Sequence, residues 1–213
     1  MLVDVKICGI NTEPALEAAI ENGARYVGFN FFPPSPRFLM PTMAASLSAQ
    51  VPSEVSRVGV FVDPRIDSLD DILMHVPLDM IQLHGHESPE EVEAIRYTFR
   101  LPVIKAIGIR TAKDFEQVEE YASVADMLLF DAKAPDGAKL PGGNALSFDW
   151  SLMAGRTFPL PWGLSGGLHA GNIAEAVRAA KAPLIDVSSG VETEPSRKDP
   201  ALIKAFLEAA KRL

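Results

Sequence analysis

The sequence predicts an α/β fold, a single-domain (β/α)8 TIM barrel over residues 1–213. Short apolar runs alternate with amphipathic helical segments along the whole chain, and eight such units fill its 213 residues. Strands that are apolar throughout indicate a parallel sheet covered by helices. A doubly wound open sheet fits the same alternation, but eight units in one chain favour a closed barrel.

The strands are expected where short apolar runs lie between turn-forming residues. In the opening stretch VDVKICGI, Val5 and Ile7 share one face while Lys6 and Cys8 share the other, because side chains alternate along a strand. Cys8 is the only cysteine, and it is either a small core group or a reacting thiol. The eight predicted strands cover residues 4–8, 26–32, 57–62, 78–84, 102–109, 126–131, 159–165 and 184–189.

Helices are expected between these strands, where capping residues precede an apolar periodicity. Thr12 and Ser88 are placed to cap two of them, and each helix has a proline in its first turn. Glu90 and Glu91 follow Ser88, where the positive end of the helix dipole favours carboxylates. The clearest predicted helices cover residues 12–23, 88–99, 170–181 and 199–213.

The net charge of −8 and the single cysteine limit the classes of partner and compartment. An acidic surface repels phosphate backbones, so no nucleic-acid partner is expected. No apolar run approaches the roughly 18 residues that span a bilayer, and no secretory leader is visible, so no membrane association is expected. A lone cysteine cannot form an internal disulfide, which is typical of a reducing compartment. We therefore expect a cytoplasmic protein.

Polar residues gather at the carboxyl ends of the predicted strands, where barrels of this kind place their sites. Cys8, Asn30 and Asp131 lie at or near the ends of three strands, and Gln82 and His84 share a face at the end of a fourth. Strands commonly stop in polar turns, which explains part of this pattern. It does not explain an inward cysteine and an inward aspartate closing two separate strands, so these two residues are the leading candidates for chemistry.

The turns after the seventh and eighth strands carry glycine and serine in a pattern typical of phosphate binding. LSGGL contains Gly166 and Gly167, and DVSSGVE contains Ser188, Ser189 and Gly190. Glycines let backbone N–H groups approach an anion closely, and serine hydroxyls add donors. The loops after strands 7 and 8 commonly bind phosphate in this fold. Together the two turns predict a phosphorylated small-molecule substrate.

Four of these residues remain open between a structural and a functional role. Asp131 is either a helix cap or a catalytic acid, and Lys6 is either solvated or, as we favour, an interior lysine paired with a carboxylate. His84 is either a base or, as we favour, a structural hydrogen-bonding residue. Arg37 lies in a proline-stiffened loop and is either an ordinary exposed arginine or a bidentate ligand for a carboxylate.

The sequence carries no metal-ligand spacing, no GxGxxG turn after the first strand and no P-loop. We therefore expect chemistry without a metal or a cofactor.

The motifs quoted so far belong to a longer ordered set. It comprises KICGI, GFNFFPPSPR, VGVFV, IQLHG, FD at the end of the sixth strand, FDW at 148–150, LSGGL, and DVSSGVE followed by KDP. This set resembles the phosphoribosylanthranilate isomerase family of tryptophan biosynthesis. The motifs run in family order from residue 5 to residue 200, so the ordered set is much more specific than any one motif.

The resemblance implies an isomerase that performs an Amadori rearrangement, the third step of the tryptophan branch. N-(5-phosphoribosyl)anthranilate becomes 1-(2-carboxyphenylamino)-1-deoxyribulose 5-phosphate. The resemblance also implies Cys8 as the general base, Asp131 as the general acid and Arg37 as the ligand of the anthranilate carboxylate. We further hypothesise that Lys6, on the same face as Cys8, lowers the pKa of the thiol. The sequence leaves both a monomer and a homodimer open.

One loop departs from the family pattern, since Asn144 and Ala145 stand where the family often has smaller residues or glycine. Among rival families, the histidine-pathway isomerase is expected to carry an aspartate in place of Cys8. Indole-glycerol-phosphate synthase should carry a lysine and glutamate set on early strands, which this chain does not show. The remaining alternative is a non-catalytic or differently specific sugar-phosphate-binding barrel, against which the presence of both Cys8 and Asp131 argues.

Overall fold

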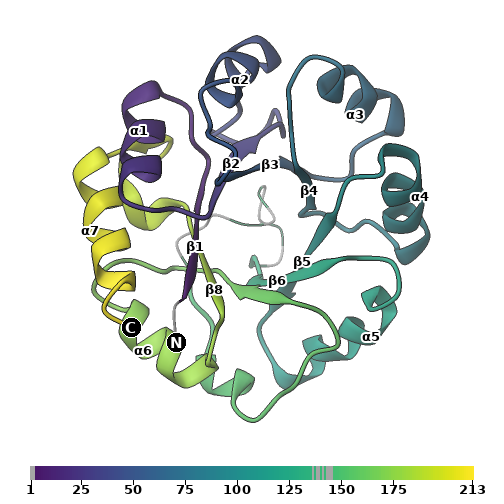
Figure 1. The fold of residues 1–213 in the computed structure, drawn as a ribbon. Helices are drawn as coiled ribbons and strands as arrows, with labels where there is room; N and C mark the ends of the chain where they lie inside the picture. Colours follow the sequence, from purple (N-terminus) through teal and green to yellow (C-terminus); the bar gives the residue numbers. More distant parts are fainter. Residues whose placement is uncertain (1–2, 136, 138–139, 141, 143–145) are drawn as a thin grey trace.

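Eight parallel strands close into a barrel in the computed structural model, which describes residues 3–135, 137, 140, 142 and 146–213. Each strand is hydrogen-bonded to the next in sequence order, and the ring closes where β1 pairs with β8 (Figure 1). The predicted closed barrel is thus confirmed, and the open sheet is excluded. The barrel strands are β1 (Asp4–Cys8), β2 (Tyr26–Asn30), β3 (Ser56–Phe61), β4 (Met80–Leu83), β5 (Val103–Ile109), β6 (Met127–Ala132), β7 (Trp162–Leu164) and β8 (Leu184–Val187).

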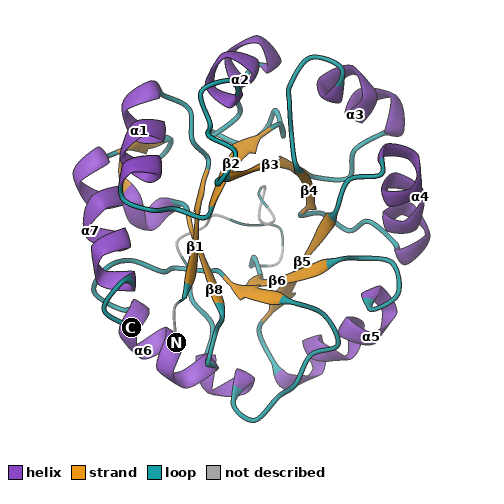
Figure 2. Ribbon diagram, viewed as in Figure 1, coloured by secondary structure: helices purple, strands orange, loops and turns teal. Residues whose placement is uncertain are grey.

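Helices surround this barrel on all sides (Figure 2). They are α1 (Glu13–Glu21), α2 (Pro41–Ser48), α3 (Ile66–Leu73), α4 (Pro89–Phe99), α5 (Val118–Tyr121), α6 (Ile173–Ala180) and α7 (Pro200–Ala210). The described residues also form three 3-10 helices: η1 (Ala112–Gln117), η2 (Trp150–Met153) and η3 (Ser189–Val191). The first and last helices, α1 and α7, lie side by side next to the seam between β1 and β8 (Figure 1).

The prediction of eight full strand–helix units is wrong for the sixth unit. Among the described residues between β6 and β7, the only helix is the four-residue 3-10 helix η2. Gly155 follows it with a φ of +73°, and Pro159 and Pro161 precede β7. Because proline lacks an N–H and clashes with the preceding helical turn, this segment cannot continue as an α-helix. The same prolines explain why β7 begins at Trp162 and not at residue 159.

The helix caps agree with the sequence at one predicted site and differ at the other. The Ser88 hydroxyl accepts a hydrogen bond from the N–H of Glu91, and the Glu91 carboxylate accepts one from the N–H of Ser88, which forms a capping box. Thr12 does occupy the N-cap position of α1, but its side chain makes no capping hydrogen bond. The Asp199 carboxylate, which the sequence analysis did not single out, caps α7 by accepting hydrogen bonds from the N–H groups of Ala201 and Leu202.

Side-chain alternation along the strands creates two apolar layers. On β1, Val5 and Ile7 are buried in the layer between the barrel and its helices, while Lys6 is buried on the opposite, inward face. A separate buried cluster of Val58, Ile104, Ala106 and Leu129 comes from alternate positions of β3, β5 and β6 and fills the barrel interior. The barrel is therefore a packed core, and polar residues are left to one end of it.

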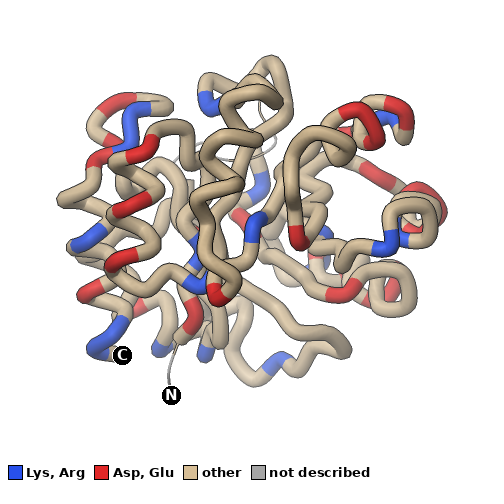
Figure 3. The backbone as a smooth tube through the Cα atoms, turned by 45° about the horizontal axis from the view of Figure 1, so that its top comes forward, with Lys and Arg blue, Asp and Glu red and all other residues tan. Residues whose placement is uncertain are grey.

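Acidic and basic residues are interspersed over the outer helices and loops (Figure 3). None of the helices in the described part of the chain is long and apolar enough to cross a membrane.

A small hairpin that the sequence analysis did not predict follows β8. Its strands, β9 (Glu192–Glu194) and β10 (Arg197–Lys198), pair antiparallel outside the barrel, and Ser196 in their turn has a φ of +71°. Strands of three and two residues carry too little periodicity to be recognised from sequence.

Candidate active site

A cavity opens at the carboxyl ends of the barrel strands, with an empty volume of about 790 Å³ that includes its solvent-open part. Of the residues predicted from the sequence, those that line it are Cys8, Asn30, Arg37, His84, Asp131, Gly166, Gly167, Ser188 and Ser189. Three other predicted residues, Lys6, Gln82 and Gly190, contact the cavity wall without lining it.

Cys8 lies at the end of β1, beside Gly28, which leaves space for its thiol, and Lys6, which places a positive charge near it. A Cβ atom on Gly28 of β2 would lie 3.1 Å from the Cys8 Sγ and 3.3 Å from the Lys6 Nζ, so a side chain there would press on the thiol and the ammonium. The Lys6 Nζ donates a hydrogen bond of 2.9 Å to the Asp186 Oδ1, and both side chains are buried. The expected interior lysine paired with a carboxylate is therefore present, and its partner is Asp186 of β8.

The pKa of the Cys8 thiol is raised above its ordinary value. Burial is the main cause; the positive charge of Lys6 lowers the pKa but only partly offsets burial, and the Asp186 carboxylate raises it further. Our hypothesis gave the direction of the Lys6 effect correctly, but the net shift of the thiol runs the other way. In turn, burial alone would lower the pKa of Lys6, while Asp186 holds it above the ordinary value.

Asp131 projects from β6 into the cavity, and both of its carboxylate oxygens have partners. The Oδ1 accepts a hydrogen bond of 2.8 Å from the N–H of Ala132, and the Oδ2 lies 3.1 Å from the His84 Nε2. The His84 Nδ1 lies 2.9 Å from the Gln82 Nε2. The cap role that the sequence left open for Asp131 is thus absent, and His84 links this carboxylate to a buried amide.

The two glycine and serine turns border the same cavity. Gly166 and Gly167 have φ values of +94° and +61°, a conformation in which a residue with a side chain is strained. Neither of their N–H groups donates a hydrogen bond to another residue that the structure describes. A Cβ on Gly190 would collide with the Leu168 carbonyl, so this glycine lets the two turns approach each other. Such paired N–H groups suit an anion.

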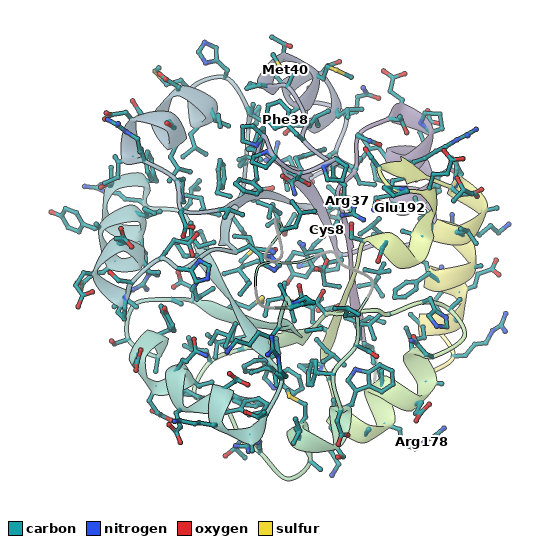
Figure 4. All side chains as sticks on the ribbon, turned by 180° about the vertical axis from the view of Figure 1, so that it is seen from behind. Cys8, Arg37, Phe38, Met40, Arg178 and Glu192 are labelled. Carbon is teal, nitrogen blue, oxygen red and sulfur yellow. The ribbon has the colours of Figure 1, made fainter. Side chains whose placement is uncertain are left out.

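Arg37 lies in the loop between β2 and α2 and is buried rather than exposed. Its Nε and one terminal nitrogen each donate a hydrogen bond of 2.8 Å to Glu192, which makes the ion pair bidentate. Figure 4 shows Arg37 beside Glu192, with Cys8 close to both. The Asn30 side chain stabilises the same loop by accepting a hydrogen bond of 2.8 Å from the N–H of Phe32.

Comparison with known proteins identifies the family that shares these features. Residues 5–209 match the family model described as N-(5'phosphoribosyl)anthranilate (PRA) isomerase. An N-(5'-phosphoribosyl)anthranilate isomerase from Paramagnetospirillum magneticum is 56% identical over 211 residues, which cover 99% of this chain and 98% of the relative. The chain belongs to the N-(5'-phosphoribosyl)anthranilate isomerase family.

Solved structures of PRA isomerases share the whole fold. A structure of monomers generated from the dimeric enzyme of Thermotoga maritima is 37% identical, with a TM-score of 0.85, and the match covers 99% of this chain and 100% of that one. A PRA isomerase in complex with reduced 1-(o-carboxyphenylamino)-1-deoxyribulose 5-phosphate is 36% identical, with a TM-score of 0.86 and the same coverage.

Three charged residues around the cavity were not predicted from the sequence as site residues. Asp186 pairs with Lys6, while Glu192 pairs with both Arg37 and Lys198. All three lie inside the DVSSGVE and KDP motifs that carry the PRA isomerase resemblance. The signal was therefore present, but the motifs do not say which of their residues face the cavity.

Gly9 has a different role from the one its place beside the thiol suggests. Its φ is +77°, and a Cβ there would lie 3.0 Å from the Arg37 Cδ and 3.3 Å from the Ser188 Oγ. Gly9 thus makes room for Arg37 and for Ser188 in the turn after β8, whereas Gly28 makes room for the thiol.

Asn144 and Ala145, where the chain departs from the PRA isomerase pattern, lie outside the described residues. Within the described part of the chain, no three His, Cys, Asp or Glu side chains are grouped so that they could hold a metal ion.

Proposed function

We propose that this chain converts N-(5'-phosphoribosyl)anthranilate into 1-(2-carboxyphenylamino)-1-deoxyribulose 5-phosphate, with Cys8 as general base and Asp131 as general acid. The observation that carries the proposal is the arrangement of one cavity. A thiol from β1 and a carboxyl from β6 line it together, and the two glycine and serine turns border it. Membership of the PRA isomerase family supplies the substrate.

Asp131 acts first, as a proton donor. Its protonated carboxyl gives a proton to the furanose ring oxygen while the C1–O bond breaks. The lone pair of the anthranilate nitrogen forms the C1=N bond, which leaves an open-chain protonated Schiff base. The carboxyl is left as a carboxylate, and the N–H of Ala132 stabilises it through the 2.8 Å hydrogen bond to the Oδ1.

Cys8 acts second, as a proton acceptor. Its thiolate removes the proton from C2, and the electron pair of that C–H bond forms the C1=C2 bond while the C1=N electrons return to nitrogen. The resulting enolamine becomes the ketone when C1 gains a proton and the C2 hydroxyl loses one. Lys6 favours the thiolate, because its positive charge lowers the thiol pKa against the stronger effect of burial.

Gln82 and His84 support the acid in both of its charge states. When Asp131 is ionised, the His84 Nε2–H donates to the Oδ2, and the Gln82 amide N–H donates to the Nδ1. When Asp131 is protonated, its O–H donates a hydrogen bond to the His84 Nε2. The neutral imidazole then carries its own proton on the Nδ1. Once the Gln82 amide rotates, its Oε1 can accept a hydrogen bond from the His84 Nδ1–H. This buried oxygen has no other partner among the described residues.

The phosphate and the aromatic carboxylate of the substrate are proposed to bind two different sets of groups at the cavity. Its phosphate binds the N–H groups of Gly166 and Gly167 and the serines at 188 and 189, and its aromatic carboxylate binds Arg37. Within this one cluster, Arg37 and Lys198 supply two positive charges against the single carboxylate of Glu192. Anionic groups at both ends of the substrate complement that excess positive charge.

A fluorescence assay with freshly prepared PRA tests the function. The wild type should turn over the substrate, and Cys8→Ala and Asp131→Asn should each lower kcat by about 10²- to 10⁴-fold, the usual contribution of a general acid or base. A sugar-phosphate-binding barrel without catalysis would instead bind the reduced product analogue and leave PRA unconverted. Full activity in either variant would reject the assigned roles.

Location and assembly complete the proposal. The lone cysteine favours a cytoplasmic location, because a reducing compartment preserves the thiol that the mechanism needs. For the assembly, both a monomer and a homodimer remain compatible with the proposal, and the dimeric Thermotoga maritima relative favours testing the homodimer first by light scattering.

A further inference from the structure

The hairpin of β9 and β10 carries two buried charged residues that the catalytic steps do not use. The Glu192 and Lys198 side chains are 3% and 0% exposed and form an ion pair of 2.7 Å. Burying charges costs free energy unless they are paired and hydrogen-bonded. The eight strands close the barrel without Glu192 and Lys198, so closure of the barrel does not explain why these two charges are buried. Their contacts show what they hold in place.

Glu192 holds Arg37 in one orientation. The carboxylate accepts two parallel hydrogen bonds from Arg37, one from Nε and one from a terminal nitrogen, each 2.8 Å long. A bidentate pair fixes the plane of the guanidinium as well as its position. Burial alone would raise the pKa of Glu192, but the hydrogen bonds from Arg37 and the charge of Lys198 hold it below its ordinary value. The pair is therefore ionised at neutral pH.

Lys198 holds the turn after β8. Its Nζ donates to the Glu192 Oε1 at 2.7 Å, to the Ser188 carbonyl at 2.8 Å and to the Ser188 Oγ at 3.0 Å. These three bonds use all three N–H groups of the ammonium. Since the Ser188 hydroxyl accepts from Lys198, its own proton is left to donate toward the cavity that Ser188 lines.

These contacts form one continuous buried link: Arg37, Glu192, Lys198 and Ser188. The link joins Arg37, which is assigned to the substrate carboxylate, to the turn at Ser188, which is assigned to its phosphate. The hairpin that carries it is anchored to the loop after β1 as well, because the Asn11 side chain donates to the Ser196 carbonyl at 2.8 Å. One element therefore ties together loops that follow β1, β2 and β8.

We propose that Glu192 and Lys198 are positioning residues that set the separation between the carboxylate-binding Arg37 and the phosphate-binding turn at Ser188. They thereby select substrates that carry an aromatic carboxylate at a fixed distance from a phosphate. This inference rests on the proposed function for the identity of the two substrate groups. Neither residue donates or accepts a proton in the reaction.

The closing experiment compares Glu192→Gln with a matched control, Asp79→Asn. Asp79 also forms a bidentate pair with an arginine, Arg57, with distances of 2.8 and 2.6 Å, but it lies next to the amino end of β4, opposite the cavity. We expect Glu192→Gln to raise the KM for PRA about tenfold or more, with kcat changed less than about threefold, as for a loss of uniform binding. Asp79→Asn should leave both constants unchanged.

Binding of two ligands separates positioning from general support of the fold. The reduced product analogue carries the carboxylate, and the corresponding phenylamino compound lacks it. In the wild type the first should bind more tightly, and Glu192→Gln should remove most of that preference. Lys198→Met should weaken inhibition by inorganic phosphate, a probe of the Ser188 side alone.

Equal weakening of both ligands by Glu192→Gln, or an unchanged KM in a folded Glu192→Gln protein, would overturn the proposal. If that variant does not fold, Glu192→Asp provides the same test, because it keeps the charge and withdraws the carboxylate by one methylene. Failure of the proposed function is a separate result, since the wild type would then leave PRA unconverted while both ligand measurements could still be made.

Discussion

Lys6 and Asp186 form an ion pair inside the barrel, directly beside the thiol of Cys8. The two residues are register partners on β1 and β8, and the Nζ lies 2.9 Å from the Oδ1. Their charges act on the thiol pKa in opposite directions, so the pair lowers that pKa less than Lys6 would alone. The pH dependence of the enzyme should reveal this balance.

The first prediction concerns that pH dependence. Because the pKa of Cys8 is raised, the thiolate fraction grows as the pH rises above neutrality, and kcat/KM should rise with it. The double variant Lys6→Met/Asp186→Asn removes the lowering effect of Lys6, which is the larger, together with the raising effect of Asp186. The thiol pKa should therefore move further up, and the rising limb of the profile should move to higher pH.

The rate of alkylation by iodoacetamide measures the same pKa without catalysis, because Cys8 is the only cysteine in the chain. The exposed variant Lys204→Met serves as the control. If the rising limb of the pH profile moves to lower pH in the double variant, the raising effect of Asp186 on the thiol pKa is larger than the lowering effect of Lys6.

The second prediction concerns His84. Replacing it with Phe removes the partner of the Asp131 Oδ2, so kcat should fall by about 10- to 100-fold while KM changes little, as for a group that supports an acid. His84→Gln places an amide near the position of the Nε2 and should restore part of the loss. Gln82→Leu should act in the same direction through His84. If KM rises and kcat is preserved in His84→Phe, the residue contacts substrate instead of the acid.

The third prediction concerns the phosphate turn. Gly167→Ala puts a side chain at a φ of +61° and a Cβ only 2.9 Å from the Leu146 carbonyl carbon. Left-handed backbone costs about 1–2 kcal/mol for a residue with a side chain, and the contact adds to this, so the turn must shift. We expect at least about a tenfold rise in KM and weaker inhibition by inorganic phosphate.

Gly155→Ala is the matched control, because Gly155 also has a positive φ, of +73°, but its Cβ would meet nothing within 4 Å. Both variants carry the backbone strain, and only Gly167→Ala disturbs the cavity. Similar kinetic constants in the two would argue against a phosphate site at this turn.

The fourth prediction concerns the stability that a buried ion pair contributes. Lys105 of β5 forms an ion pair of 2.6 Å with Glu87, and their side chains are 3% and 2% exposed. Lys105→Met leaves a buried carboxylate without its counter-charge, so the free energy of unfolding in urea should fall by about 3–5 kcal/mol. The exposed pair of Lys204 and Glu208 offers the control, and Lys204→Met should cost less than about 0.5 kcal/mol. A loss of similar size in the two variants would contradict the prediction.

Most of the fold could be predicted because strand alternation is a local signal. On β1 the pattern placed Val5 and Ile7 outside and Lys6 and Cys8 inside, as the structure has them. The replacement of an α-helix by the 3-10 helix η2 between β6 and β7 was not predicted. It depends on where the prolines before β7 force the chain to turn. The β9–β10 hairpin was missed because its stability comes from contacts with distant loops and not from its own pattern.

In the candidate site as well, residues marked by a local pattern could be predicted, and residues selected by tertiary contacts could not. Cys8 and Asp131 could be predicted, because each ends a strand and a barrel brings the ends of all its strands together. The partner of Lys6 could not be named, because many carboxylates follow apolar runs and only the register of β1 on β8 selects Asp186. Glu192 and Lys198 needed the tertiary structure for the same reason, since their partners lie in other loops.

Lys6 and Asp186 are separated by 180 positions in the chain, yet they meet at the seam where the ring shuts. A nascent chain that has emerged through β7 already contains Cys8, Asp131 and Arg37, but it lacks the strand that carries the counter-ion of Lys6. Contacts between such distant positions form late, because closing a long loop costs entropy before the contact repays it. We therefore expect competence for the reaction to be acquired late in folding, and regain of activity during refolding should follow closure of the ring.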